Sequence, residues 1–448
     1  MDVKTYHISC FALFVVLLLG QWFCVAVVLT SWVFQIAHIV LTYCSMKIPS
    51  KEGTQERFGR NFYAESGVSI LKPLCGTRPT LYENLRSYFT LEYPMFELIF
   101  CVADEQDAAL EVVERLRKEF PDVSTLVSFG TQDVGINPKI CNVSTGYSVA
   151  NHTLIWMADD NVVASDAALQ DMVNKCVDGA RLVHQVPWSL SGPNVEATLG
   201  SMSCGSILER WYFAAAHGRP YTVINNVVCT CLNGMSNMFS KKHLDELGGL
   251  ARFGNTLNED GEIGFAFDRH GYPTSISNHA AIQNVGAIDV SQYVERRVRW
   301  TRIRNKYGKT KWTAPFELVV DSHVVSLCCL GILVHYHGAA SAWVMPLHQA
   351  AWLLVDATAF MLMDKSVALP KSWENHSIDW GRVSKTTRGV YFYLLNALQH
   401  YGMWVVREYI TVYVRILSLI DTDNIVWKDN EIPIDDDSAE EEEPDKSD

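Results

Sequence analysis

Thr153-Leu-Ile-Trp-Met-Ala-Asp-Asp-Asn161 is the stretch from which the fold can be predicted. Its apolar part, Thr153–Met157, is too short for a helix and is bounded by polar residues, which favours a buried strand. The carboxyl end of that strand, where ligands bind in open α/β sheets, would carry Asp159, Asp160 and Asn161. Such oxygen donors suit Mg²⁺ or Mn²⁺ shared with phosphate oxygens. The alternative is an acidic turn before a helix that Ser165 caps.

Other short apolar runs before and after this stretch predict further strands at Val68–Leu71, Phe96–Val102, Ser124–Phe129 and Ala180–Val186. The first of them is expected to stop at Pro73. Helical spacing of apolar residues occurs at Thr80–Phe89 and Ala108–Phe120. Alternating strands and helices predict an α/β fold, a Rossmann-like and mostly parallel sheet with helices on both faces.

The amino-terminal segment predicts a membrane anchor. Residues from Ile8 to about Met46 include no Asp, Glu, Lys or Arg, more than the roughly 20 residues that cross a bilayer. We expect a retained anchor from Ile8 to about Leu29 that continues into an interfacial or tilted extension. Four basic residues follow it, and the positive-inside rule then places the next domain in the cytosol: Lys47, Lys51, Arg57 and Arg60.

The carboxyl-terminal third predicts further membrane contact. Leu318–Met363 is long enough for a hairpin of two spans, with Gly338 near the turn. Tyr391–Ile420 contains three charged residues, which are costly inside a bilayer, so a helix at the interface or over the active site is preferred to a third span: Arg407, Glu408 and Arg415. The predicted segments are an anchor (1–46), a cytosolic catalytic domain (47–312), membrane-spanning and interfacial helices (313–420) and a disordered acidic tail (421–448).

The net charge of −13 resides mostly in that tail, where 13 Asp/Glu face two lysines. The rest of the chain is close to neutral, so a basic surface for nucleic acid is not expected. The 12 cysteines are scattered, and we interpret them as reduced thiols on the cytosolic side.

Two further residues are candidates for nucleotide binding. Asp104 follows the predicted strand Phe96–Val102, and in a parallel sheet it would reach the same edge as Asp159, where it could accept hydrogen bonds from a base or ribose. Its alternative role is a helix N-cap. Lys139 follows Gly135 and Pro138 in a predicted rigid loop, Val134–Ile140, and could lie near a diphosphate, although lone lysines are usually only solvated.

Two later motifs are candidates for catalysis. Glu259 and Asp260 could supply an ionised general base, or could act as an acidic helix cap, and the two roles are compatible. Arg296 and Arg299 are three residues apart and would share one helix face, where guanidinium groups suit a diphosphate leaving group, with Trp300 as an apolar anchor. A basic cluster beside a membrane span is the alternative.

Two isolated residues give weaker indications. His217 follows an aromatic run, and a histidine in such a place is more often structural. Cys231 invites comparison with a nucleophile, but no histidine is evidently paired with it.

Taken in order, the acid at Asp104, the D-x-D-like site, Glu259-Asp260 and Arg296-x-x-Arg299-Trp300 resemble the family 2 type glycosyltransferases of the GT-A fold, and within them the ceramide glucosyltransferases. The resemblance spans roughly residues 8–420. It departs from the family pattern at Asn161, where the third position of the D-x-D-like site is not Asp. Which side chain ligates a metal, and how strongly metal is needed, therefore stay open.

The resemblance implies UDP-glucose as donor and ceramide in the bilayer as acceptor, with inversion at the anomeric carbon. It implies that Asp260 is the base, that Arg296, Arg299 and Trp300 hold the leaving UDP and the acceptor side, and that His217 lies near the active site. A set of UDP-glucose-binding residues follows: Asp104, Lys139, Asp159, Glu259 and Cys231. It also implies a multi-pass protein of the Golgi or a related endomembrane with a cytosol-facing site; a homo-oligomer is possible.

Three rival functions stay open. A processive polysaccharide synthase would need more confident spans than this chain offers. A transporter or scaffold would not need acids at strand ends, and its charges should lie within spans. A non-catalytic lipid-binding relative would keep binding when Asp260 is changed.

Overall fold

The computed structural model describes residues 3–46, 66–190, 203–307, 314–374, 387–420, 424–427 and 430–433. Its centre is a seven-stranded sheet in the order β3-β2-β1-β4-β8-β6-β9. The strands are β1 (Val68–Leu74), β2 (Phe96–Val102), β3 (Thr125–Phe129), β4 (Leu154–Ala158), β6 (Leu182–His184), β8 (Ser236–Ser240) and β9 (Thr274–Ile276). The predicted α/β fold is confirmed. The sheet is mixed, because β8 runs antiparallel to both β4 and β6.

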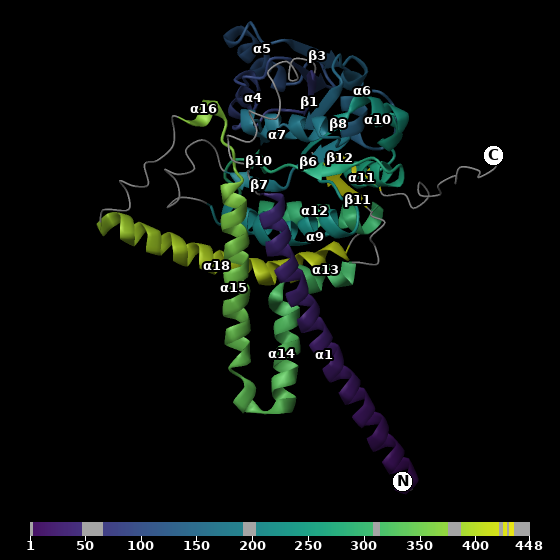
Figure 1. The fold of residues 1–448 in the computed structure, drawn as a ribbon, viewed down its shortest axis with the longest axis vertical. Coiled ribbons are helices and arrows are strands. Elements are labelled where there is room, and N and C mark those ends of the chain that lie inside the picture. Colours follow the sequence, from purple (N-terminus) through teal and green to yellow (C-terminus); the bar gives the residue numbers. More distant parts are fainter. Residues whose placement is uncertain are drawn as a thin grey trace, which may run out of the picture.

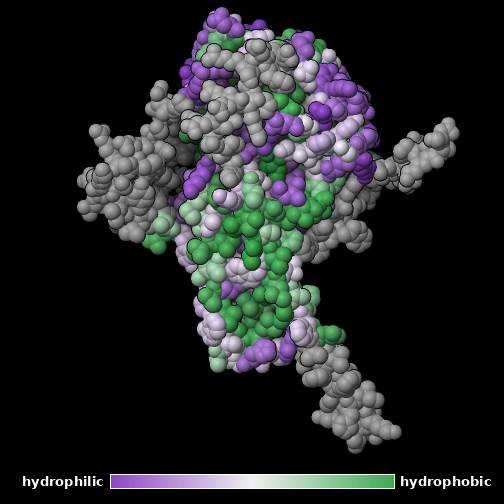
Figure 2. Space-filling view, in the orientation of Figure 1, coloured by the Kyte–Doolittle hydropathy of each residue, from purple (hydrophilic) through white to green (hydrophobic). Residues whose placement is uncertain are grey.

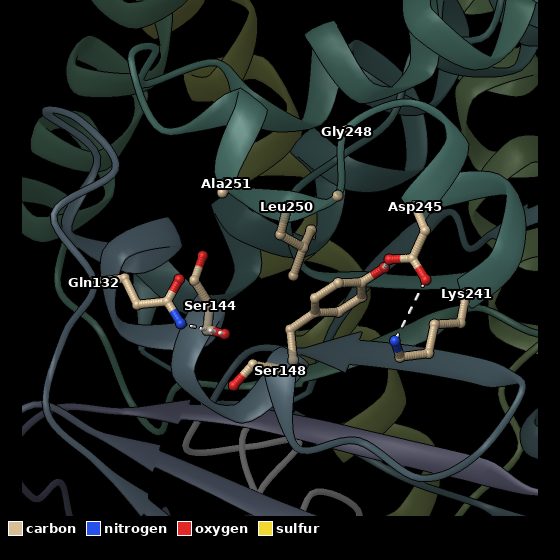
Figure 3. A pocket seen from close by; sticks show the side chains of 10 residues that line it. Gln132, Ser144, Ser148, Lys241, Asp245, Gly248, Leu250 and Ala251 are labelled. Carbon is tan, nitrogen blue, oxygen red and sulfur yellow. Dashed lines mark hydrogen bonds and ion pairs between the residues drawn. The ribbon is translucent and has the colours of Figure 1, made fainter.

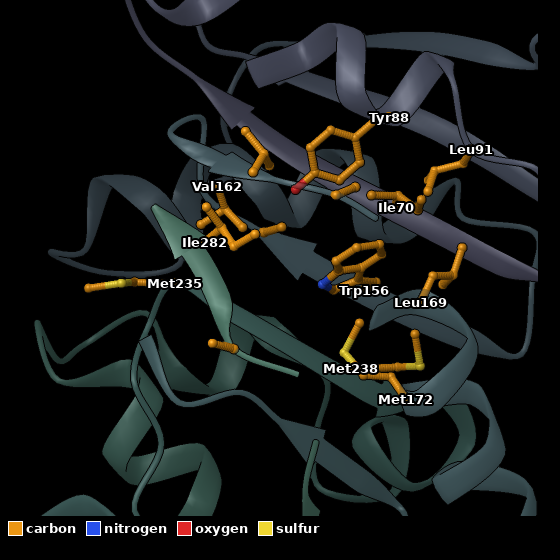
Figure 4. Packing of buried hydrophobic residues seen from close by; sticks show 14 of the residues in the cluster. Ile70, Tyr88, Leu91, Trp156, Val162, Leu169, Met172, Met235, Met238 and Ile282 are labelled. Carbon is orange, nitrogen blue, oxygen red and sulfur yellow. The ribbon is translucent and has the colours of Figure 1, made fainter. Parts of the chain in front are cut away.

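Helices cover both faces of this sheet. One face packs against α4 (Leu81–Phe89), α5 (Ala109–Glu119) and α7 (Asp166–Val177), and Figure 4 shows part of that core around Trp156. The other face packs against α6 (Pro138–Ser148), α10 (Lys241–Glu246) and α11 (Glu259–Arg269). Burial of both faces explains why β2 and β4 are continuous apolar runs rather than alternating ones.

The domain also contains a three-stranded sheet in the order β5-β10-β7, whose strands follow β4, β6 and β9 along the chain. Its strands are β5 (Val162–Val163), β7 (Pro187–Leu190) and β10 (Ala281–Asn284). The remaining elements of the domain are α8 (Cys204–Trp211), the π-helix η1 (Tyr212–His217), α9 (Gly218–Val227), the 3-10 helix η2 (Leu250–Phe253) and α12 (Val290–Tyr307).

Two local predictions in this domain are wrong. Strand β1 continues through Pro73 to Leu74; β4 pairs only with Val68–Leu71, so the proline lies where the strand has a neighbour on one side, which tolerates a missing N–H. The stretch Val134–Ile140 is not entirely a loop, because Pro138 begins α6. The Asn137 side chain accepts from the Lys139 and Ile140 backbone N–H groups and caps that helix.

The apolar ends of the chain form a helical stem below the domain (Figure 1). Helix α1 (Val3–Ser45) is unbroken, so the predicted change of structure near Leu29 does not occur. Among the described helices, its part Leu19–Ser45 is the one long and apolar enough to cross a membrane. Helices α14 (His323–His337) and α15 (Val344–Lys365) form the predicted hairpin, and Gly338, with a φ of 89°, ends α14.

Helix α18 (Thr387–Ser418) runs across this hairpin rather than alongside it (Figure 1). Its charged residues Arg407 and Arg415 have partners, and its place at a membrane interface stays a prediction. Arg407 pairs with Asp356 at 3.0 Å, and Arg415 pairs with Asp321 at 2.8 Å. Figure 2 shows hydrophobic residues over the stem and mostly hydrophilic ones over the domain above it. Membrane crossing by the carboxyl-terminal helices stays a prediction.

The remaining elements are short. They are α13 (Ala314–Asp321), the 3-10 helix η4 (Ala339–Ser341), α16 (Lys371–Glu374), β11 (Asn424–Trp427) and β12 (Asn430–Pro433). Strands β11 and β12 pair with each other, and β11 contacts α12, so residues 424–427 and 430–433 are not disordered as predicted. The other residues of that predicted tail (421–423, 428–429 and 434–448) lie outside the described part of the chain.

Candidate active site

The turn Asp159–Asn161 lies at the carboxyl end of β4 and is fixed by its backbone. The Asp159 N–H donates to the Met235 carbonyl at 2.9 Å, and the Asn161 carbonyl accepts from the Asn284 N–H at 2.7 Å. Ser165, not the acids, caps the next helix, since its Oγ accepts from the Ala168 N–H. The two carboxylates are therefore not held there as caps.

Lys139 joins three segments at this edge. Its Nζ lies 3.0 Å from Asp159 Oδ1 and 3.3 Å from Glu259 Oε1, and it donates to the Gly234 carbonyl at 2.5 Å. Its side chain is only 10% exposed, which excludes the solvated lysine considered above. These anionic neighbours raise the pKa of Lys139 against the opposing effect of burial, so the lysine stays charged.

Asp260 lies beside this cluster in the first turn of α11. A methyl group on Gly234 would come within 3.6 Å of the Asp260 carboxylate and 3.3 Å of Lys139 Nζ, so Gly234 leaves the space between them open. Burial, and then the charge of Glu259, raises the pKa of Asp260 to about 7. A carboxyl group with such a pKa changes its charge near physiological pH, as a general base should.

Arginines meet the cluster from α12. Arg296 contacts Glu209 at 3.2 Å and donates to Gln283 Oε1 at 3.0 Å. Burial, and then the nearby cations Arg296, Arg297 and Arg78, lowers the pKa of Arg299 to about 10. Arg78 itself pairs with Asp160 at 3.0 Å. The guanidinium groups therefore lie close enough to repel one another beside the turn, and an anion bound there would relieve that repulsion.

Arg297 has a different role from its neighbours. It is 3% exposed, pairs with Glu209 at 3.1 Å and lies over the rings of Trp300 (3.7 Å) and Tyr212 (4.1 Å). Trp300 thus packs against Arg297 and the ring of Phe213, and its anchoring surface is the domain itself. Of the consecutive arginines, Arg297 holds the helix in place.

His217 and Cys231 are both half-buried. His217 ends η1, stacks on Tyr221 at 5.3 Å, and has its pKa lowered to about 3 by burial and by Arg297, so it is neutral. Burial and the charge of Asp260 raise the pKa of the Cys231 thiol to about 12. A protonated thiol is a weak nucleophile, which disfavours covalent catalysis by Cys231.

Asp104 is a predicted site residue that the described contacts do not bring to the cluster. It is exposed, and its carboxylate accepts from the Gln106 N–H at 2.8 Å. The helix cap considered for it belongs to Asp107, which accepts from the Ala109 N–H. Asp104 follows β2, and β1 separates β2 from β4, so about 10 Å of sheet edge lies between Asp104 and Asp159, about the length of a nucleoside.

Two residues were missed by the sequence analysis. Lys72, in the neighbouring strand β1, is fully buried and donates to the carbonyls of Asp159 (2.5 Å) and Val162 (3.4 Å). It therefore fixes the backbone of the acidic turn. Arg78 follows β1 and neutralises Asp160. A lysine inside the apolar run Val68–Leu74 was a usable signal for the first, whereas Arg78 had none.

The oxygen atoms of the turn Asp159–Asn161 can be compared with the ligands that a divalent cation needs. Asp159 keeps 29% of its side chain exposed, and Asn161 Oδ1 is buried without a hydrogen-bond partner among the described residues. Asp160 is already paired with Arg78. In the described part of the chain, no group of three or more His, Cys, Asp or Glu could hold a metal alone. The donors fit a hard cation that completes its coordination with phosphate oxygens.

A separate cavity of about 400 Å³ is shown in Figure 3. It lies between α6, α10 and η2, near the amino end of β4, because the Lys241 N–H donates to the Thr153 carbonyl. Tyr147 donates to Asp245 inside it at 2.5 Å. It shares no lining residue with the acidic cluster and lies at the opposite end of β4.

The fold and this cluster of acids, lysine and arginines are those of a nucleotide-sugar transferase, and comparison with known proteins gives the family. The model of Glycosyl transferase family 21 matches residues 26–439, and this chain belongs to that family. It is a glycosyltransferase related to the ceramide glucosyltransferases, which confirms the predicted resemblance.

Two relatives from Caenorhabditis elegans illustrate the similarity. Ceramide glucosyltransferase 3 is 31% identical over 366 residues, covering 81% of this chain and 72% of the relative. Ceramide glucosyltransferase 1 is 29% identical over 374 residues, covering 82% and 72%. Among solved structures, the mannosyltransferase PcManGT from Pyrobaculum calidifontis in complex with GDP-Man and Mn²⁺ is similar with a TM-score of 0.44 and 14% identity, covering 87% of this chain and 98% of that one.

Proposed function

We propose that this protein transfers glucose from UDP-glucose to the primary hydroxyl of ceramide with inversion, in a single displacement. One observation carries the proposal: a half-buried carboxyl group with a raised pKa, Asp260, lies beside the Lys139–Asp159 pair at the carboxyl end of β4. The relatives named as ceramide glucosyltransferases support the choice of substrates.

In this mechanism Asp260 takes the proton of the acceptor hydroxyl as its oxygen attacks the anomeric carbon. Burial supports that role, because it makes the carboxylate more basic than a solvated one. The hydroxyl is a poor nucleophile until this proton leaves. A single attack from the face opposite to UDP inverts the anomeric carbon.

The departing UDP gains negative charge, which Arg296 and Arg299 would stabilise as preorganised cations. Glu209 pairs with both Arg296 and Arg297 and would thereby fix the orientation of the Arg296 side chain. Lys139 would hold Asp159 and Glu259 in place near the diphosphate. His217, neutral and stacked on Tyr221, would shape the acceptor side without exchanging a proton.

Asp159 and Asn161 would hold Mg²⁺ or Mn²⁺ together with the diphosphate, and that cation would supply further positive charge to it. Asp104, at the end of β2 and two strands away from Asp159, would bind the uridine portion. Glu259 and Cys231 complete the proposed donor-binding set.

We also propose that α1 anchors the protein in a Golgi or related membrane with the catalytic domain on the cytosolic side. The apolar segment Leu19–Ser45 supports an anchor, and the basic residues that follow it support the orientation. An acceptor that stays in the bilayer requires such a location.

The test is to identify the product. Purified protein in detergent is incubated with each of several radiolabelled nucleotide sugars and several lipid acceptors. We expect glucosylceramide from UDP-glucose and ceramide only. A polymeric product would favour a polysaccharide synthase, and ceramide binding without any product would favour a non-catalytic relative.

The rate of transfer should depend on pH through Asp260. The base must be ionised, and its pKa is raised to about 7, so the ionised fraction falls as the pH drops through 7. We expect kcat/KM to fall about tenfold per pH unit below pH 6 and to level off above pH 8. A rate that is constant from pH 5 to pH 8 would contradict this role.

Arg299→Ala should raise the KM for UDP-glucose and lower kcat, each by roughly tenfold, since charge-assisted contacts to phosphate contribute about 1.5–3 kcal/mol. Kinetics with varied UDP-glucose measure both effects. Lys306→Ala, a loss of the same charge in the last turn of α12, is the control and should leave both constants nearly unchanged. Equal effects of the two variants would favour the membrane-proximal basic cluster instead.

A further inference from the structure

The most exposed apolar side chains of the catalytic domain are two adjacent valines. Val227 and Val228, at the end of α9, are 68% and 73% exposed, whereas every other large apolar side chain between residues 68 and 307 that the structure describes as exposed is at most 45% exposed. Their exposure singles out this pair as a candidate apolar contact surface.

These valines form the tip of a short loop that is closed by its own hydrogen bonds. Asn225 Nδ2 donates to the Cys231 carbonyl, and the Cys231 N–H donates to Asn225 Oδ1, both at 2.8 Å. Thr230, in the same loop, donates through its hydroxyl to Asp268 of α11 at 2.7 Å. The valines are therefore held outward by a rigid base, and that base is attached to the helix that carries Asp260.

The other side of the loop touches the end of the membrane anchor. Asn226 Nδ2 donates to Ser45 Oγ at 3.2 Å, and Thr222, one turn earlier, contacts His38. Helix α1 buries its polar face here, with Ser31, Gln35, His38 and Thr42 all 0% exposed. Its outward face is an apolar stripe with the i, i+3, i+4 spacing of one helix side: Leu29, Val33, Ile36, Val40 and Tyr43.

A helix with its polar side inward and its apolar side outward is arranged for a hydrocarbon surrounding, not for water. The stripe ends at Tyr43, and the valine loop contacts Ser45 on the opposite, polar face of α1. Figure 2 shows hydrophobic residues continuing up the stem to the border of the polar domain. The valine pair therefore lies beside the end of the candidate membrane span, on the loop that leads to Cys231, whose thiol is close enough to Asp260 to be affected by its charge.

We infer that Val227 and Val228 bind the hydrocarbon chains of the lipid acceptor where these leave the bilayer along α1, so that the polar head of that lipid reaches Asp260. This inference rests on the proposed function. It assigns the acceptor site to the α1–α9 side of the domain, whereas the diphosphate is held on the α12 side. Contact with the valines would keep part of the hydrocarbon out of water as the head leaves the bilayer.

The test uses Val227→Asp/Val228→Asp in the full-length protein. Long-chain ceramide in phosphatidylcholine vesicles and a short-chain ceramide dispersed in water are the two acceptors. We expect the apparent KM for the long-chain acceptor to rise about tenfold or more, with a much smaller change for the short-chain one. The Kd for UDP-glucose should stay unchanged. Val227→Leu/Val228→Leu should retain the wild-type KM.

Val149→Asp is the matched control, because Val149 is a 44% exposed valine at the end of α6, remote from α1 and α9. An unchanged KM for long-chain ceramide in the Asp double variant overturns the inference, and so does an equal rise in Val149→Asp. These outcomes leave the proposed function intact if the wild type makes glucosylceramide. A wild type that makes none removes the proposed function itself.

Discussion

Asp260→Asn is expected to lower the rate of glucose transfer by about 10²- to 10⁴-fold, the usual contribution of a general base. The asparagine side chain keeps the shape of the carboxyl group and can still accept the Gly261 N–H, which Asp260 Oδ1 does at 2.8 Å. It cannot take a proton from the acceptor. The measurement is kcat with saturating UDP-glucose and ceramide.

Binding separates this effect from a loss of the site. The Kd for UDP-glucose should change by less than about threefold, since Asp260 repels Glu259 and Asp159 and contributes no cation to the diphosphate. Glu262→Gln, two residues later on α11, removes the same charge and should leave the rate nearly unchanged. Near-normal turnover in Asp260→Asn would exclude Asp260 as the base.

Asp356→Leu is expected to destabilise the protein by about 3–5 kcal/mol, the cost of leaving buried charges without their partner. Asp356 is 0% exposed and accepts from Arg219 at 2.6 Å and Arg407 at 3.0 Å. Trp404 and Gln35 also donate to it, at 2.9 and 3.2 Å. One carboxylate therefore joins α1, α9, α15 and α18, the helices on which the domain rests.

The measurement is the thermal unfolding midpoint of the detergent-solubilised protein. Thr358→Ala, on the exposed side of α15, is the control and should have little effect. Adding Arg219→Met to Asp356→Leu should recover part of the loss, because it removes one of the charges that the first change left unpaired. A double variant less stable than the single one would contradict this explanation.

Asp356 and Arg407 also show why charge content alone predicted the carboxyl-terminal helices only coarsely. Each appeared in the sequence as a charge within a mainly apolar segment, which argues against a membrane span. In the structure they neutralise each other across 51 residues of chain. A charge paired in this way does not indicate whether its own helix contacts lipid. The polarity of the outward-facing side chains is the better indicator.

Local pattern was sufficient where the chain makes its structure from neighbouring residues. The buried run Thr153–Met157 placed β4 to within a residue, because strand period and strand length are short-range properties. The same reasoning located β2, α4 and α5 to within a residue or two. It misplaced the end of β1, since whether Pro73 is tolerated depends on which neighbour a strand has.

The sequence by itself determined the α/β fold, the long apolar helix at the amino terminus and which residues are candidates for the site, because each depends on a contiguous pattern of residues. Only the tertiary structure decided what those residues contact. Lys139 meets Glu259 across 120 residues, Arg297 faces inward while Arg299 lies among the cations near Asp160, and Lys72 supports the acidic turn from a strand 87 residues earlier. These partners follow from packing in three dimensions, and spacing along one chain carries no information about them.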